Sequence, residues 1–223
     1  LNSLINTTTM RSPPAQRSVR FAQQLQQRLR NPAGGVQFPS ARQRTMICAI
    51  VDVEAGLTTT TAALKQQLPA NNPAPAQNSP PPTKAWLQQP IQFGANVVAV
   101  MVPLSYATLK SALASSPQTR NWRELKENPI TENQLNEILA VESPTLFIAR
   151  AYTSKISRCE VNVDHRTLEL NDGFAPLLQK IDGSTSVADI LLELEKVGAG
   201  DQIVQSVRNG FEQLLTYSII KLN

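Results

Sequence analysis

Residues 186–216, SVADILLELEKVGAGDQIVQSVRNGFEQLLT, decide the fold prediction for the C-terminal half of the chain. Ser186 with Asp189 three residues later is a capping-box pattern, which marks the start of a helix. After the glycines at 198 and 200, Asp201 is predicted to cap a further helix. The stretch therefore predicts two successive amphipathic helices, whose apolar faces are Val187, Ile190, Leu191 and Leu194, and Val204, Val207, Phe211 and Leu214 or Leu215.

Two predicted units share the order strand, three helices, strand. In the second unit, a strand at 160–170 precedes a helix that starts at Asn171 or Asp172 and ends at Gly183, and a strand at 217–222 closes the unit. In the first unit, the predicted elements are a strand at 97–102, helices at 105–114, at 122–126 and from Thr131 or Glu132, and a strand at 145–148. This is the order of a winged-helix-like module. The sequence thus predicts an α+β, mainly helical fold with two tandem winged-helix-like modules, residues 91–150 and 151–223.

The first 90 residues predict a different organisation. Apolar residues at helical spacing predict a helix at 16–30, a β-branched run predicts a strand at 45–51, and a short helix is expected at 62–68. Residues 69–90 hold seven of the sixteen prolines and are typical of a semi-rigid polyproline II linker. We therefore predict a basic helical and strand segment at 1–68 and a Pro-rich linker at 69–90.

Charge is distributed unevenly along the chain. Residues 1–90 contain nine Lys or Arg against Asp52 and Glu54, a net charge of +7, whereas residues 91–223 have a net charge of −3. Attraction for an acidic partner is therefore expected in the first part, and the predicted partner-binding residues are Arg17, Arg20, Arg28, Arg30, Arg42 and Arg44. The Arg-rich start also resembles an organelle transit peptide in composition, but we expect a cytoplasmic protein.

The motifs of common catalytic centres are not found in the sequence. It has no glycine-rich dinucleotide or phosphate loop, no Gly-x-Ser-x-Gly and no Cys-x-x-Cys. His165, the single histidine, is expected at the end of a strand in a structural or solvated role, and Cys48 and Cys159 are expected to be buried free thiols. We expect no catalytic residue, cofactor or metal on this chain, and no transmembrane helix, because no apolar run reaches about 18 residues.

The predicted third helices argue against DNA recognition. A helix that enters the major groove normally presents basic or amide side chains to the phosphates and bases. Here the first unit presents Glu132, Glu137 and Glu142, and the second has Arg208 between Asp201 and Glu212. A protein or peptide partner is therefore expected rather than nucleic acid.

Several stretches resemble a known family. Residues 42–49, RQRTMICA, are similar to the Arg-x-Thr-Leu-Leu-Cys segment that follows the predicted regulatory domain in bacterial S-adenosylmethionine-dependent methyltransferases, a family that includes the rickettsial protein lysine methyltransferases. The similarity continues in patches from 90–93 through 122–125. It then includes 149–151, 161–170 and 177–185, where Ile181 replaces the usual leucine. The nucleotide-binding half of such enzymes is not found in these 223 residues.

The resemblance implies a non-catalytic substrate-recognition or regulatory region of a methyltransferase, whose partner is the methyltransferase domain or its substrate. Residues 170–222 also resemble winged-helix peptide-binding domains that present precursor peptides to maturation enzymes. The Asp-Gly dipeptide of those domains is present here as Asp182-Gly183. That family implies an adaptor that pairs a peptide with a strand edge. The adaptor is the main alternative, and a nucleic-acid-binding protein is the third.

Overall fold

The computed structural model describes residues 14–31, 41–67, 84–107, 133, 137, 144–156 and 161–223. These residues form helices and two small sheets. The first half comprises α2 (Pro14–Arg30), α3 (Ala41–Gln67), η1 (Lys84–Gln88), β1 (Pro90–Phe93) and β2 (Val97–Val102). The second half comprises β3 (Thr145–Ile156), β4 (Val161–Asn171), η3 (Asp172–Phe174), α7 (Ala175–Leu178), β5 (Asp182–Ser186), α8 (Val187–Lys196), α9 (Asp201–Thr216) and β6 (Ile220–Leu222).

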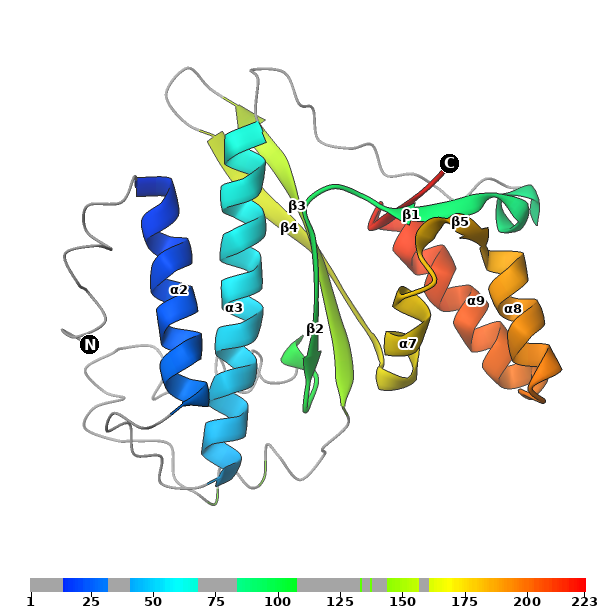
Figure 1. The fold of residues 1–223 in the computed structure, drawn as a ribbon, viewed down its shortest axis with the longest axis horizontal. Coiled ribbons are helices and arrows are strands. Elements are labelled where there is room, and N and C mark those ends of the chain that lie inside the picture. The colour runs from blue at the N-terminus through cyan, green and yellow to red at the C-terminus, as the bar shows by residue number, and fades with distance from the viewer. Residues whose placement is uncertain are drawn as a thin grey trace.

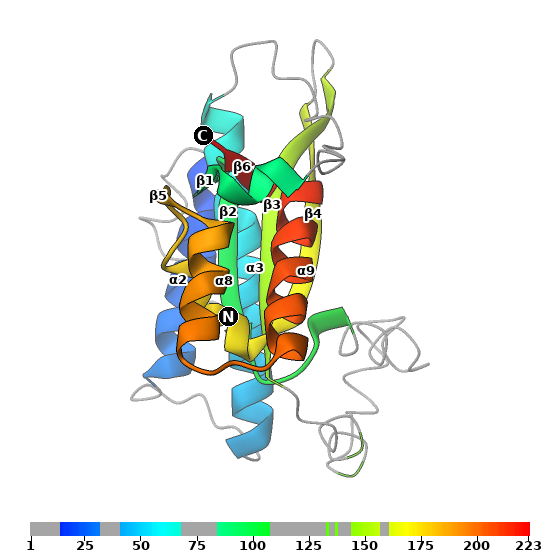
Figure 2. The same ribbon diagram turned by 90° about the vertical axis from the view of Figure 1, so that its right-hand side faces the viewer.

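The described elements are arranged in layers around sheet B, the antiparallel sheet of order β2-β3-β4 (Figure 1). Helices α2 and α3 run side by side on one face, and α7 and α9 lie on the other, with α8 beyond (Figures 1 and 2). Sheet A, of order β5-β1-β6, covers one end of α8 and α9.

Burial on both faces explains the sequence of β3. Leu146 and Ile148 face the core around α9, whereas Phe147 and Ala149 face α3, and each of the four is at most 2% exposed. A strand covered on both faces needs apolar residues at every position, so the alternation of a half-buried strand is absent here. Sheet B is therefore shared by both helical layers.

The C-terminal helices form the main core as predicted. Ser186 and Asp189 make the capping box of α8, and Val187, Ile190 and Leu191 are buried on it. Gly200 rather than Asp201 is the N-cap of α9. Phe211 of α9 is fully buried and stacks at a tilt on Phe174, with ring centroids 5.0 Å apart. The capping-box and core predictions for 186–216 are confirmed, and the N-cap at Asp201 is wrong by one residue.

The prediction of two tandem modules is not confirmed. Its boundary between residues 150 and 151 falls inside β3, so it does not separate two units. Each sheet also combines strands from both predicted modules: β1 lies between β5 and β6, and β2 pairs with β3, which pairs with β4. Strand order depends on long-range pairing, which a local pattern does not contain. Of the predicted helices at 105–114, 122–126 and from 131, all but residues 105–107, 133 and 137 lie outside the described part.

The predicted strand at 45–51 is wrong, because these residues belong to α3. Threonines of α3 are accommodated in the helix because their hydroxyls bond to the preceding turn. The hydroxyls of Thr45, Thr59 and Thr60 donate to the carbonyls four residues earlier, at 2.8–3.1 Å. Packing of α3 on α2 and all three strands of sheet B outweighs the β propensity of this run.

Helix α3 also bears on the expectation of no transmembrane helix. By length and composition, its residues 44–67 are the one described segment apolar enough to cross a membrane, with a third of the most apolar window buried within the protein. Helix α3 packs on α2 and on sheet B, and the expectation of no transmembrane helix stays a prediction.

Two local predictions in the second half need correction. Gly183 does not end a helix but lies in β5 with φ +86°, where the Asp182 carboxylate accepts from the amides of Ser184 and Thr185. The predicted helix before it ends instead with α7 at Leu178. His165 lies inside β4 rather than at its end.

Of the Pro-rich linker, residues 69–83 lie outside the described part, and residues 84–90 form η1 and the start of β1.

Candidate functional site

A groove runs between β2 and the two N-terminal helices. It has a volume of about 550 Å³ and is lined by Gln23, Gln26 and Arg30 of α2, by Asp52, Ala55, Gly56, Thr59 and Thr60 of α3, and by residues 97–101 of β2. A volume of this size falls within the range of ligand-binding clefts. We refer to it below as the β2 groove.

One edge of β2 is unpaired among the described residues, since its recorded partner is β3 alone. The Ala151 amide donates to the carbonyl of Asn96, which lies opposite it in the register, so this is a hydrogen-bonded pair of the antiparallel ladder. Because such pairs alternate, Val98, Val100 and Val102 bond to β3. The backbone groups of Val97, Ala99 and Met101 therefore point to the other edge.

The composition of β2 is unusual for an edge strand. Natural edge strands are commonly protected by charges, proline or a bulge. β2 has none of these between Val97 and Val102, and its pairing with β3 is regular. Met101 remains 46% exposed, and Ala99 is also exposed. The free edge thus offers unprotected backbone donors and acceptors on an apolar strand.

Glycine at position 56 sets the distance between α3 and β2. A Cβ atom at Gly56 would lie 2.7 Å from Val98 Cγ2, closer than non-bonded carbons approach. The helix therefore sits directly against the strand at this point, and the groove extends along the strand edge from there.

The polar end of the β2 groove is built around the Asp52 carboxylate. One guanidinium nitrogen of Arg30 donates to both Asp52 oxygens, at 2.9 and 3.0 Å, and Gln26 Nε2 donates to Oδ1 at 2.9 Å. Arg44 Nη2 donates in turn to the Arg30 carbonyl at 2.8 Å. The Arg30 side chain is still 63% exposed, so its remaining donors face solvent at the groove.

His165 joins α3 to the far strand of sheet B. Its Nε2 lies 3.2 Å from the Thr60 hydroxyl and 3.3 Å from that of Thr61. Burial lowers the pKa of His165, and a hydrogen bond to the Leu57 backbone and the charges of Asp164 and Glu54 oppose that shift. The neutral ring is therefore favoured, in agreement with the structural role expected for this histidine.

A second polar contact closes the same interface. The Tyr106 hydroxyl donates to Glu54 of α3, and its ring packs edge-on against Phe147 with centroids 5.1 Å apart. Burial raises the pKa of Tyr106, and the Glu54 carboxylate raises it further. The hydroxyl therefore stays protonated as a donor, and α3 has polar contacts both to Tyr106, after β2, and to His165 of β4.

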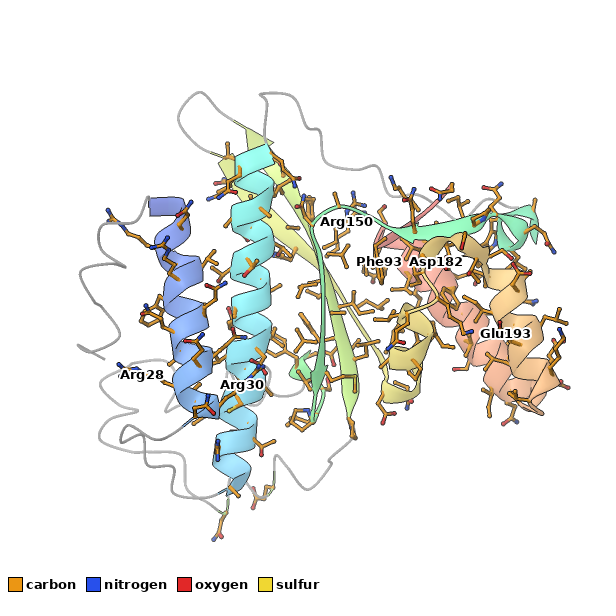
Figure 3. The ribbon with its side chains drawn as sticks, in the orientation of Figure 1. Arg28, Arg30, Phe93, Arg150, Asp182 and Glu193 are labelled. Atoms are coloured by element: carbon orange, nitrogen blue, oxygen red, sulfur yellow. The ribbon has the colours of Figure 1, made fainter. Side chains whose placement is uncertain are left out.

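The predicted partner-binding arginines lie mainly on α2. Arg17, Arg20, Arg28 and Arg30 are exposed there, and Figure 3 shows Arg28 on the outer side of the helix and Arg30 beside α3. Arg20 lines a smaller hollow between α2 and α3, next to the β2 groove. The structure brings together Arg30 and Arg44, whereas the Arg42 side chain lies outside the described part.

No protein-family model, curated protein or solved structure matches this chain. Among the described residues, no group of three or more His, Cys, Asp or Glu side chains could hold a metal ion. Cys48 is a free thiol, only partly buried on α3, and Cys159 lies outside the described part. The geometry of the β2 groove is therefore the basis for inferring its function.

The sequence analysis missed both the β2 groove and the role of Asp52. Asp52 is the first acidic residue in a chain that already has seven arginines before it, which is a signal for an ion pair with the preceding helix. The open edge of β2 had no comparable signal, because an apolar strand has the same composition at the edge of a sheet and at its centre.

Proposed function

We propose that this chain is a recognition module that binds an extended peptide segment of a partner protein by strand addition to β2. The observation that supports it most is the edge at Val97, Ala99 and Met101, which pairs with no strand in the described part of the chain and opens onto the β2 groove. In strand addition, main-chain hydrogen bonds provide affinity and pockets for alternate side chains provide specificity.

The groove suggests which side chains the peptide carries. The side chains of Val98, Val100 and Val102 face α3, so every second side chain of an added strand would point to the same side, over the groove. That side presents the amides of Gln23 and Gln26 and the exposed guanidinium of Arg30. We therefore expect polar or acidic side chains at alternate positions of the peptide.

Sheet A is a weaker candidate for strand addition. β6 has only three residues, and β5 pairs with β1 through a register shift. Two amides of β5 already donate to the Asp182 carboxylate, which lowers the pKa of this group to about 2. Short and irregular edges offer few backbone groups to a peptide. The second winged-helix-like module, predicted at residues 151–223, also remains part of this proposal, although its sheet takes up β1 from outside those bounds.

The experiment selects peptides and then removes one backbone donor. A displayed library of random peptides is panned against the full chain, and affinities of enriched peptides are measured for wild type, A99P and A99V. A99P deletes an N–H that points away from β3, and A99V keeps it. We expect A99P to weaken binding about tenfold, the equivalent of one lost hydrogen bond, and A99V to bind like wild type. Enriched peptides that bind A99P as tightly as wild type would refute strand addition.

The link to a methyltransferase, implied by the resemblance of residues 42–223, is a further part of the proposal. A recognition module of this kind would present a substrate segment to the enzyme domain and needs no cofactor of its own. The gene provides the test. A nucleotide-binding methyltransferase domain in the same reading frame supports the link, and a frame without one favours a separate peptide-binding adaptor.

A further inference from the structure

A second hollow lies on the side of the molecule away from the β2 groove. Its volume is about 480 Å³, and most of its lining consists of apolar side chains of η1 and α8 with one arginine of α9: Leu87, Ala188, Leu191, Leu192 and Arg208. Figures 1 and 2 show α8 and α9 on the far side of sheet B from α2 and α3. We refer to it below as the α8 hollow.

The wall of the α8 hollow follows one face of α8. Ala188, Leu191, Leu192 and Glu195 recur at the spacing of helical neighbours, over a length of about 10 Å. Leu87 and Leu191 are buried, whereas Leu192 is 49% exposed. Side chains of a second helix pack against a row of this spacing as ridges into grooves. The shape of the hollow therefore favours a helical occupant.

Arg208 brings an unused hydrogen-bond donor to this apolar lining. Its side chain is half-buried, and its Nε is buried without a hydrogen-bond partner. Among the described residues, no acidic side chain forms an ion pair with it. A buried donor of a charged group is costly when it has no acceptor. An acidic side chain of an occupant would pair with this guanidinium.

Two carboxylates in the same lining restrict what the occupant is. Asp189 lies in the first turn of α8, where hydrogen bonds from the side chain and backbone of Ser186 hold its pKa below the ordinary value. Glu195 lies in the last turn, is exposed, and forms no ion pair within the described part of the chain. Together with Arg208, they give the lining a net negative charge, which repels a fatty acid or another anionic amphiphile. A peptide helix can present both basic and acidic side chains to match all three groups.

We propose that the α8 hollow is the docking site for a short amphipathic helix of a partner protein. The helix inserts apolar side chains spaced i, i+3 or i+4, and i+7 beside Leu192, in the helix-in-groove mode of recognition. Its basic side chains face Asp189 and Glu195, and an acidic side chain faces Arg208. Because the hollow is separate from the β2 groove, the chain can hold a peptide strand and a second protein at once. The proposal does not depend on peptide binding at β2.

The first test selects helical peptides that need the hollow. A displayed library of peptides of about 20 residues, each an alanine-rich helix with one face varied, is depleted on L192E and then panned against the full wild-type chain. Enriched peptides should bind L192E at least about tenfold more weakly than the wild type, because a carboxylate replaces an apolar contact. I203E is the matched control, since Ile203 is also exposed, at 55%, but lies outside the lining. It should bind the peptides like the wild type.

Charge substitutions test how the helix is oriented. R208Q removes the cation that faces the acidic peptide residue and should weaken binding about tenfold. E195K should weaken it about fivefold, and exchange of one basic peptide residue for Glu should restore the affinity for E195K. These losses distinguish a helix held by the proposed charge pattern from apolar adhesion, which both substitutions would leave unchanged.

Two further variants identify the site and the conformation of the peptide. A99P, at the edge of β2, should bind the enriched peptides like the wild type. A proline at the centre of the peptide should abolish binding, because it breaks the helix. The docking site would be overturned by no enrichment after depletion, by equal weakening in L192E and I203E, by binding that R208Q and E195K leave unchanged, by loss of binding in A99P, or by peptides that tolerate the central proline.

Discussion

The two faces of sheet B are covered in different ways. On the face toward α9, eighteen buried apolar residues form one continuous cluster that includes Trp86, Phe174 and Phe211. On the face toward α3, the described cluster contains five, two of which are alanines. Because burial of apolar area is the main stabilising contribution, the first face should hold the fold together. The second is anchored largely by polar contacts and leaves a groove beside β2.

Truncation of one buried side chain on each face tests this difference. F211A removes a fully buried ring that packs on Phe174 and should lower the free energy of unfolding by about 3–5 kcal/mol. V53A removes two methyl groups from the fully buried side chain on α3 and should cost about 2 kcal/mol. Urea unfolding measures both. An equal or larger loss for V53A would reverse the comparison.

Substitutions at two glycines, one on each face of sheet B, test the same difference in packing. A Cβ at Gly210 would lie 2.4 Å from Cε2 of the buried Phe174 ring, whereas a Cβ at Gly56 would meet a terminal methyl of the half-buried Val98. G210A should therefore destabilise by about 1–3 kcal/mol through overpacking. G56A should change the free energy of unfolding by less than about 1 kcal/mol, because the gain in helix propensity offsets the energetic cost of moving the Val98 side chain. Denaturant midpoints that rank the two variants the other way would contradict the account.

The smallest expected effect on the free energy of unfolding comes from His165, which joins α3 to β4. His165 has a folded-state pKa below its ordinary value of 6.5, so the unfolded chain binds the proton more tightly. Its contribution to stability is therefore fully present above pH 6.5 and is lost as the pH falls from there through the folded pKa. H165Q, which has no titratable ring, should show a flatter dependence of unfolding free energy between pH 7.5 and 5.5. Parallel pH profiles for wild type and H165Q would contradict this role.

The parts of the fold that local patterns specify could be predicted from the sequence. Helix α2, strand β2 and the capped helix α8 follow from periodicity and from Ser186 with Asp189. Helix α3 could not be predicted, because its threonines and β-branched residues favour a strand until its packing on sheet B is known. The position of β1 between β5 and β6 also depends on pairing across about 90–130 residues, as between Ile91 and Leu222.

The candidate site shows the same limit. The Arg-rich character of α2 was evident from the sequence, and the arginines at 30 and 44 do lie at the groove or next to it. That β2 leaves one edge open follows from sheet order, which the chain determines only once it has folded.

Amide hydrogen exchange of β2, followed residue by residue by NMR, tests the central claim most directly. In the free chain, the amides of Val98 and Val100 should be protected by β3, and those of Ala99 and Met101 should exchange at least about tenfold faster, because their N–H groups point to the open edge. Of these four amides, a peptide selected on the chain should slow exchange only at Ala99 and Met101. Equal protection of all four amides in the free chain would mean that the edge of β2 is already covered, and the proposed mode of recognition would be wrong.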